Sequence, residues 1–154
     1  MMNTVKHLRK SSLPSLQKKR CSSDKNNSRN AYITAVLFAS LVGTYLDLFF
    51  VGKGLYTFPA RPFPEIFSIN IVFTLFILPL FTALFLLVAT KVGLYIRVSI
   101  IFMISVIGFF IEQYTEEIGW FTHHGKWNHL YSFWGYMIFW MVIWRFYRWI
   151  MDFD

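Results

Sequence analysis

The residues best suited to chemistry gather between residues 112 and 132, in the stretch EQYTEEIGWFTHHGKWNHLYS, which holds three glutamates and three histidines. Carboxylate and imidazole groups together are ligands for zinc, iron and manganese. Glu112 and Glu116 lie four residues apart and therefore share one face of a helix. His124 and His129 are five residues apart and do not align in this way. These four side chains are the candidate metal ligands.

The spacing of these ligands is weak support for a metal site. The stretch contains no HExxH motif, in which two histidines and a glutamate lie on one helix. Interfacial histidines without a ligand role are the simpler interpretation. The single cysteine, Cys21, excludes a cysteine-based zinc site and an intramolecular disulfide. We therefore leave a metal undecided at this point and expect no cofactor.

Two acidic residues, Asp47 and Glu112, each follow a stripe of small residues. The stripes are Ala35, Ala39 and Gly43 before the first acid, and Ser105 and Gly108 before the second. Small residues at helical spacing let two helix backbones approach closely in lipid. We therefore predict that the two helices pack along these stripes, which brings Asp47 and Glu112 together near the outer membrane interface.

This pair of acids could carry a proton or bind a cation. A carboxylate near the centre of the hydrocarbon costs about 2.5–3.5 kcal/mol, and two carboxylates held together raise the pKa of at least one of them. The alternative is that both acids lie at water level, where they pair with Lys53, Arg61 or Lys126. Both interpretations stay open.

The elements that must position these residues are apolar helices. Of the 154 residues, 56% are hydrophobic and 15% are charged, against about 25% charged in soluble domains. A helix needs about 20 apolar residues to cross about 30 Å of hydrocarbon. Four runs are long enough: residues 31–51, 66–89, 92–111 and 131–151. We predict an all-α fold in which residues 31–154 form an integral membrane bundle of four transmembrane helices.

Three residues within these apolar runs are unfavourable in lipid unless their polar groups find partners. Pro79 lies inside the second run, and a proline there is tolerated in lipid only where neighbouring groups satisfy the carbonyl that it frees. The third and fourth runs hold Arg97 and Arg145, whose long side chains must reach the headgroups.

Residues 1–30 differ from the rest of the chain. They hold eight basic residues and one acidic residue, a charge of +7 that equals the net charge of the whole protein. They contain few apolar residues, so we predict a disordered basic tail. Such a tail would adhere to anionic lipid headgroups, at about 1 kcal/mol per basic residue near the surface. Its lack of aromatic residues argues against nucleic acid as a partner, whereas its serine-rich, acid-poor composition also matches an organelle transit peptide.

Counting lysine and arginine near the helix ends indicates the orientation. With the tail inside, the inner side holds 12 of these residues and the outer side holds three, which are Lys53, Arg61 and Lys126. We therefore predict a multi-pass protein of the cell membrane with both termini in the cytoplasm. The stretch of glutamates and histidines then lies on the outer face.

Several segments resemble a known group of proteins. They are GTYLDLFFVGKGLYTFP, RPFPEIFSIN, the Glu112-x3-Glu116-x2-Gly119 pattern and NHLYSFWGY. Over roughly residues 40–140 the chain resembles a family of small uncharacterised multi-pass membrane proteins of endospore-forming bacteria. The resemblance implies a bacterial cytoplasmic membrane and a bundle of about four helices, and it implies no activity. The long basic tail departs from this group.

Three functions stay open. The first is a structural or accessory protein of the cell envelope that binds lipid and other membrane proteins or itself. The second is a small oligomeric ion-coupled transporter that uses Asp47 and Glu112. The third is a metal-dependent membrane enzyme of the outer face that uses Glu112, Glu116, His124 and His129. The chain has no GxGxxG, Walker, GxSxG or HExxH motif, so we favour the first function and lean against an enzyme.

Overall fold

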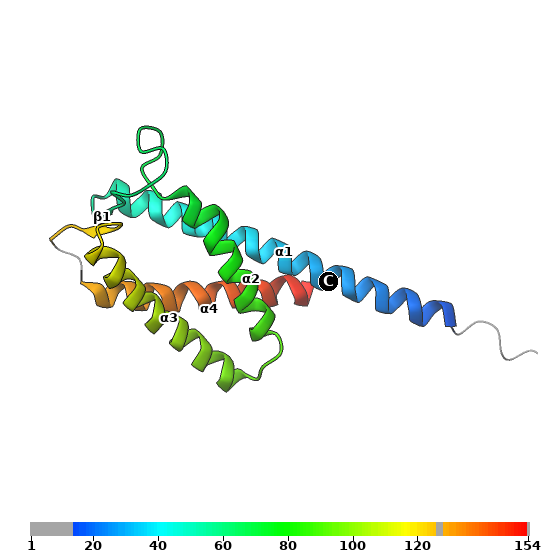
Figure 1. Ribbon diagram of the computed structural model, residues 1–154. Helices are drawn as coiled ribbons and strands as arrows, with labels where there is room; N and C mark the ends of the chain where they lie inside the picture. The colour runs from blue at the N-terminus through cyan, green and yellow to red at the C-terminus, as the bar shows by residue number, and fades with distance from the viewer. Residues whose placement is uncertain (1–13, 126–127, 154) are drawn as a thin grey trace, which may run out of the picture.

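The computed structural model describes the backbone of residues 14–125 and 128–153, with side chains from residue 27 onward. Within this part of the chain the fold is all-helical, as predicted, apart from a short two-stranded sheet. The elements in chain order are α1 (Pro14–Gly52), β1 (Tyr56–Thr57), the π-helical segment η1 (Phe73–Ile77), α2 (Leu78–Ala89), α3 (Leu94–Glu117), β2 (Thr122–His123) and α4 (His129–Phe153) (Figure 1).

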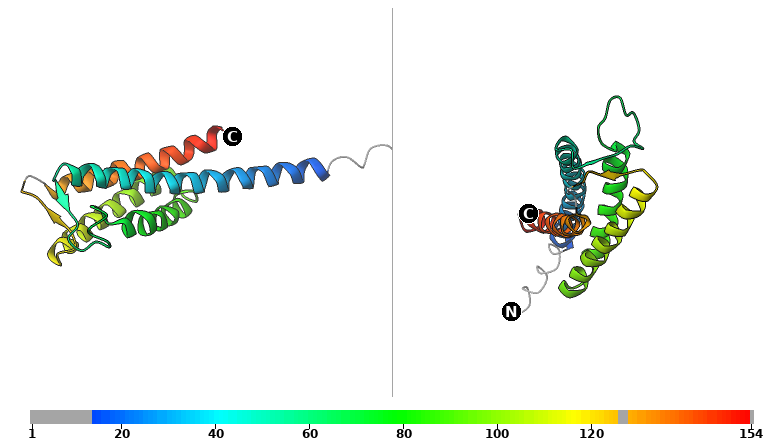
Figure 2. Two further views of the ribbon diagram at one scale, coloured as in Figure 1. Left: turned by 90° about the horizontal axis from the view of Figure 1, so that it is seen from above. Right: turned by 90° about the vertical axis from the view of Figure 1, so that its left-hand side faces the viewer.

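Helix α1 begins much earlier than the predicted apolar run at residues 31–51. It starts at Pro14, which suits the first position of a helix, and no proline or glycine interrupts the chain from there to Gly43. Once the apolar half of a helix has formed, each further turn costs little. Residues 14–30 of the predicted disordered tail are therefore helical, while residues 1–13 lie outside the described part. Figure 2 shows this end of α1 projecting beyond the other helices.

Helix α4 packs against both α1 and α3, and α1 also packs against α2. The buried apolar residues form one cluster where these helices meet: Ala31, Ala35, Phe85, Leu86, Ala89, Ile101, Trp140 and Tyr147. Within this cluster the rings of Phe85 and Trp140 lie 5.0 Å apart. Small alanines on α1 thus face large rings on α2 and α4, which lets the helices approach closely.

The small-residue stripe of α1 packs on α2 rather than on α3, contrary to our prediction. Ala35 and Ala39 are fully buried. A side chain at Gly43 would overlap the side chain of Leu78, the first residue of α2. The absence of a side chain at Gly43 therefore makes room for a bulky aliphatic group from α2, and this face of α1 is already occupied.

The small-residue stripe of α3 packs on α4. Ser105 is fully buried, and a Cβ atom at Gly108 would lie 3.1 Å from the ring of Tyr136. A ring needs a flat surface, which glycine provides. The two stripes therefore each accommodate a large side chain from a different neighbour instead of meeting each other.

Two helices are long and apolar enough to span a membrane, Asn27–Gly52 within α1 and Leu94–Glu117. Only 11% of each apolar stretch is buried, which is not the burial of a core helix in a soluble protein. Large apolar side chains cover the outside of the bundle instead: Leu37 and Leu41 are 66% exposed and Phe76 is 70% exposed. Such a surface is costly in water, whereas lipid solvates it.

The second predicted run, residues 66–89, is only partly helical. Its apolar helix, Phe73–Ala89, is about 26 Å long, which is shorter than the hydrocarbon core. Helix α4 is long enough, but it is not among the helices that are apolar enough to span. Length and composition therefore support two spans where we predicted four.

The loop before η1 explains the shortened second helix. Three prolines between residues 59 and 64 remove backbone donors and restrict the chain, and Phe63 has a positive φ of 52°. Arg61 then fixes the loop, because its guanidinium donates hydrogen bonds to the carbonyls of Phe58, Pro64 and Phe67.

The π-helical segment η1 is related to the proline that follows it. The N–H of Leu78 bonds to the carbonyl of Phe73, five residues earlier, and the next such bond would come from Pro79, which has no N–H. The carbonyl left over is that of Thr74, and the hydroxyl of Ser40 on α1 donates to it at 2.7 Å. A neighbouring helix thus satisfies the carbonyl that the proline frees.

Candidate metal centre

The candidate site lies where α3 ends, the short sheet crosses and α4 begins (Figure 1). Gly119 follows the end of α3, and its φ of 75° is a left-handed conformation that glycine adopts readily. The N–H groups of Gly119 and Trp120 bond back to the carbonyls of Glu116 and Thr115 at 3.0 and 2.9 Å, which is a Schellman motif. The chain therefore reverses and returns over the helix end.

The sheet decides which histidine enters the site. Strands β1 and β2 are antiparallel, with Tyr56 opposite His123 and Thr57 opposite Thr122. The two threonine hydroxyls lie 2.8 Å apart and hold this register. Neighbouring side chains of a strand point to opposite faces, so the His123 side chain is only 7% exposed while His124 is exposed. His124, a predicted ligand, therefore lies outside the group of converging side chains, and His123 lies in its place.

Asn128 positions the start of α4. Its side-chain oxygen accepts a hydrogen bond at 3.0 Å from an N–H in the first turn of the helix, as an N-cap residue does. This cap fixes His129 at the first position of α4. Ser132 and Tyr136 follow three and seven residues later, on the same face of the helix. All three side chains face α3.

Glu112 is the centre of the cluster, and it is only 7% exposed. The hydroxyl of Ser132 donates to its Oε1 at 2.5 Å, and that of Tyr136 donates to its Oε2 at 2.6 Å. His123 Nε2 lies 3.1 Å from Oε1, and His129 Nδ1 lies 3.9 Å from the same oxygen. Residues of α4 and β2 therefore hold both oxygens of this buried carboxylate.

Glu116 holds His123 from the other side. Its Oε1 accepts a hydrogen bond from the backbone N–H of His123 at 3.0 Å, and its Oε2 lies 3.0 Å from the Nδ1 of the same residue. The Nε2 of His129 is 3.7 Å from this Oε2. Because Glu112 and Glu116 share a helix face, they flank the His123 ring and each contacts a different nitrogen.

Three ligand atoms converge in this cluster. They are one oxygen of Glu112 and one nitrogen each of His123 and His129, all within 4.8 Å of one another. Two ligands of a tetrahedral zinc ion lie about 3.3 Å apart, so the most distant ligand atoms must approach by about 1.5 Å at most. The Nδ1 of His129 is buried and makes no hydrogen bond within the described part of the chain. A metal ion would give this nitrogen a partner.

Asp47 does not belong to the cluster itself and is linked to it through Tyr56. The hydroxyl of Tyr56 donates to Asp47 Oδ1 at 2.7 Å, and the Tyr56 ring stands edge-on to that of His123 at 6.3 Å. Burial, followed by the charge of Asp47, raises the pKa of Tyr56 above its ordinary value, so the hydroxyl stays a donor at neutral pH. Asp47 therefore contacts Tyr56 instead of Glu112, and contacts through Tyr56 and His123 connect the two acids.

Aromatic side chains cover the cluster. The ring of Phe121 lies 4.6 Å from that of His123 and 4.9 Å from that of Tyr56. Phe58, from the loop after β1, lies 5.3 Å from Phe121. This apolar cover lowers the local dielectric constant and so strengthens the polar interactions beneath it.

The structure brings together three of the four predicted ligands, Glu112, Glu116 and His129. Three side chains of the cluster were not predicted: His123, Ser132 and Tyr136. The two hydroxyl residues are four positions apart, and this spacing on the predicted fourth helix is a signal that could have found them. His123 gives no such local signal, because only the pairing with β1 separates it from its neighbour.

Comparisons of the chain with protein-family models, curated proteins and solved structures find no match. Its function must therefore be inferred from the site. The site offers two imidazoles and one carboxylate, with a second carboxylate behind one of the imidazoles.

Proposed function

We propose that this protein is a multi-pass membrane protein of the cell envelope that binds a divalent transition metal through Glu112, His123 and His129. The observation that carries this proposal is the convergence of the three ligand atoms within 4.8 Å. Beside them lies a buried nitrogen of His129 that has no hydrogen bond among the described residues. Two imidazoles and one carboxylate are a common ligand set for zinc and iron.

The position of His123 between two carboxylates supports a cation at this site. One of its nitrogens lies 3.1 Å from Glu112 and the other lies 3.0 Å from Glu116. A neutral imidazole has a single N–H and can donate to only one of them. The other nitrogen and its carboxylate then need a cation between them, which is either a second proton or a metal ion. With the N–H directed at Glu116, the arrangement is that of a carboxylate that orients a metal-binding histidine.

The proposed metal ion keeps an open coordination position. Three protein ligands leave one position of a tetrahedral ion for water or for a donor atom from another molecule. Ser132 and Tyr136 orient Glu112 by hydrogen bonds. Because the sequence has no catalytic motif, we assign the metal to an accessory binding role in the envelope.

The proposed membrane placement has two supports. Parts of α1 and α3 are long and apolar enough to span a membrane, and α2 and α4 would complete a bundle of four spans. The excess of lysine and arginine on one side, 12 against three, favours a cytoplasmic location for both termini. In this orientation the metal centre faces the outside of the cell.

The metal proposal is tested by loading the detergent-purified protein with Zn²⁺ or Co²⁺ and measuring bound metal by mass spectrometry after dialysis. We expect a single bound ion per chain, with the Co²⁺ absorption of tetrahedral coordination. His129→Ala should weaken binding by at least about tenfold. His124→Ala, at the exposed neighbouring histidine, is the matched control and should bind normally. No binding by the wild type, or equal loss in both variants, would overturn the proposal.

The orientation is tested with Cys21, the single cysteine of the chain. A membrane-impermeant maleimide should leave Cys21 unlabelled in intact cells and should label it after lysis. A variant with Cys21→Ser and Gly125→Cys should instead be labelled in intact cells. Labelling of Cys21 from outside would overturn the orientation, and it would leave the metal proposal standing.

A further inference from the structure

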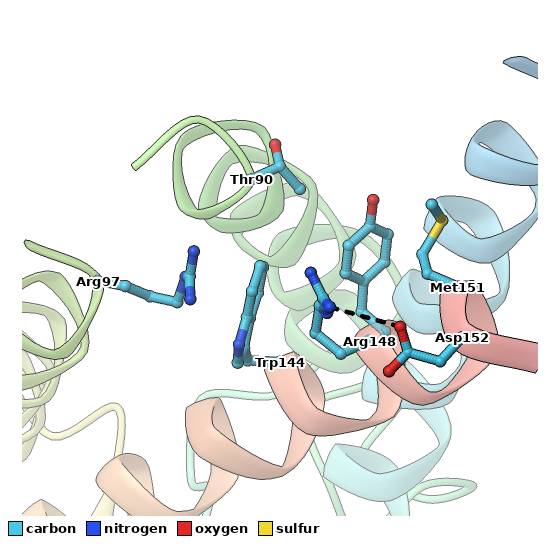
Figure 3. A pocket seen from close by; sticks show the side chains of 7 residues that line it. Thr90, Arg97, Trp144, Arg148, Met151 and Asp152 are labelled. Atoms are coloured by element: carbon cyan, nitrogen blue, oxygen red, sulfur yellow. Dashed lines mark hydrogen bonds and ion pairs between the residues drawn. The ribbon is translucent and has the colours of Figure 1, made fainter. Parts of the chain in front are cut away.

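A second polar site lies at the opposite end of the helices, where α2 ends, α3 begins and α4 ends (Figure 3). It is a cavity of about 210 Å³ that we call the arginine cavity, and it is lined by Arg97, Arg148, Trp144, Tyr147, Thr90, Met151 and Asp152. Along α3, Glu112 lies fifteen positions after Arg97, which is about 22 Å of helix. The arginine cavity is therefore separate from the metal centre.

Arg97 is held in place by backbone carbonyls. Its Nε donates to the carbonyl of Ala89 at 2.9 Å, and its Nη2 donates to that of Val92 at 2.6 Å. These carbonyls belong to the end of α2 and the turn after it, where a helix leaves carbonyls without intrahelical partners. The guanidinium lies 3.7 Å from the ring centre of Trp144, a cation–π contact. Its Nη1 makes no hydrogen bond to the described residues, so it is available to a ligand.

Arg148 lines the same cavity from α4, and Figure 3 shows Trp144 between the two arginine side chains. Its ion pair with Asp152 is 3.4 Å long, and both side chains are more than half exposed, so the pair is weak. The positive charges of Arg97 and Arg148 repel each other. One exposed carboxylate cannot balance two cations, and the arginine cavity keeps an excess of positive charge.

We infer that the arginine cavity binds the phosphate of an anionic lipid headgroup. Arginine forms charge-assisted hydrogen bonds with phosphate oxygens, and basic pockets between helices on the cytoplasmic side take anionic headgroups. Trp144 and Tyr147 are residue types that concentrate at the headgroup level. This inference rests on the proposed membrane placement and is independent of the metal centre.

The surroundings of the cavity favour a lipid over free phosphate. The last turns of α2 precede Thr90, and they expose Leu87 and Val88 by 49% and 48%. These two residues precede Ala89, whose carbonyl accepts the hydrogen bond of Arg97, and they offer an apolar surface to acyl chains. Free phosphate would gain the same hydrogen bonds without this contact.

Native mass spectrometry of the detergent-purified full chain tests the inference. We add phosphatidylglycerol, phosphatidylcholine or inorganic phosphate, and expect the protein to retain phosphatidylglycerol at least about fivefold better than the other two. Arg148→Gln should lower this retention by about fivefold, because it removes one cation from the cavity. Arg145→Gln removes the same charge from the same helix outside the cavity and should have little effect.

Three results would overturn the inference. Equal losses in Arg145→Gln and Arg148→Gln would show diffuse attraction between headgroups and helix charges. Retention of inorganic phosphate as strong as that of phosphatidylglycerol would show a free-anion site. Retention of phosphatidylcholine as strong as that of phosphatidylglycerol would show that the headgroup charge is not recognised. His129→Ala should retain phosphatidylglycerol normally, so failure of the metal proposal would leave this result unaffected.

Discussion

At the candidate metal centre, Glu112 is 7% exposed and is surrounded by hydroxyl and imidazole groups, whereas in the arginine cavity Arg148 is 53% exposed and has one carboxylate partner. At this end of the bundle, the Glu112 carboxylate has hydroxyl and imidazole partners, and aromatic side chains cover the group. At the other end, backbone carbonyls and the ring of Trp144 hold Arg97 in place, whereas Arg148 lies near the surface. The bundle therefore holds a buried carboxylate with several partners at one end and partly exposed arginines with few partners at the other.

The difference shows how a mostly apolar chain can hold charged residues. A buried carboxylate needs several partners, because the loss of water costs more than any single contact returns. A long arginine at a helix end keeps its stem among apolar groups and its head near water, so it needs fewer partners. Substitutions at the candidate metal centre should therefore destabilise the fold more, whereas the arginine cavity keeps hydrogen-bond donors that an outside ligand could use.

The largest effect should come from Glu112→Leu, which removes the acceptor that Ser132, Tyr136 and His123 share. Breaking a buried charged network costs about 3–5 kcal/mol. The free energy of unfolding in detergent, measured by SDS titration with circular dichroism, should fall by that amount. Glu117→Leu, at an exposed position, should change it by less than about 0.5 kcal/mol. Equal effects of the two substitutions would show that the buried contacts of Glu112 do not stabilise the fold.

The next effect is stabilisation by added Zn²⁺. At a free concentration about 100 times its dissociation constant, the ion should stabilise the native state by about 2.7 kcal/mol. Hydrogen–deuterium exchange should slow most in β1 and β2, while the turn between α2 and α3 should be unaffected. At the same concentration of Zn²⁺, a tenfold loss of affinity in His129→Ala should lower this stabilisation to about 1.4 kcal/mol or less. Equal protection at both ends would contradict a local metal centre.

Arg97→Gln should have a smaller effect, confined to the other end. It removes two charge-assisted hydrogen bonds and a cation–π contact, with an expected loss of about 2 kcal/mol in the free energy of unfolding. Exchange should become faster in the turn between α2 and α3 and stay slow in the sheet. Arg145→Gln, an exposed arginine, is the control. Faster exchange in the sheet would mean that the two ends are coupled.

The smallest effect should come from Gly119→Ala. The φ of 75° at this position costs a residue with a side chain about 1 kcal/mol. Because the turn places His123 over Glu116, the variant should also bind metal more weakly. Gly125→Ala, at a glycine with no positive φ and open space around it, should leave both stability and metal affinity unchanged. Equal results for the two glycines would show that the turn does not position the site.

The helices that hold the candidate metal centre could be predicted, because a long apolar run in the sequence is itself a sign of a helix. The predicted runs 92–111 and 131–151 overlap α3 and α4 along most of their length. The second run could not be placed in the same way. Its apolar composition continues through the loop, where prolines and the hydrogen bonds of Arg61 prevent a helix.

The part of the candidate site that lies on a single helix could be predicted from the spacing of its residues. The four-residue spacing places Glu112 and Glu116 on one face, and the structure shows both against His123. The choice between the two adjacent histidines depends on pairing with Tyr56, which lies 67 residues away in the chain. A contact over that distance leaves no pattern in the residues around it.

The π-helical segment at Phe73–Ile77 has a consequence for the length of the chain. Its turns hold more residues than those of an α-helix, so the deletion of one residue there can be absorbed by a return to α-helical geometry. In a regular helix such as α3, the same deletion would rotate all later side chains by about 100° and would carry Glu112 away from α4. The deletion of a single residue should therefore be tolerated better at this segment than in α3.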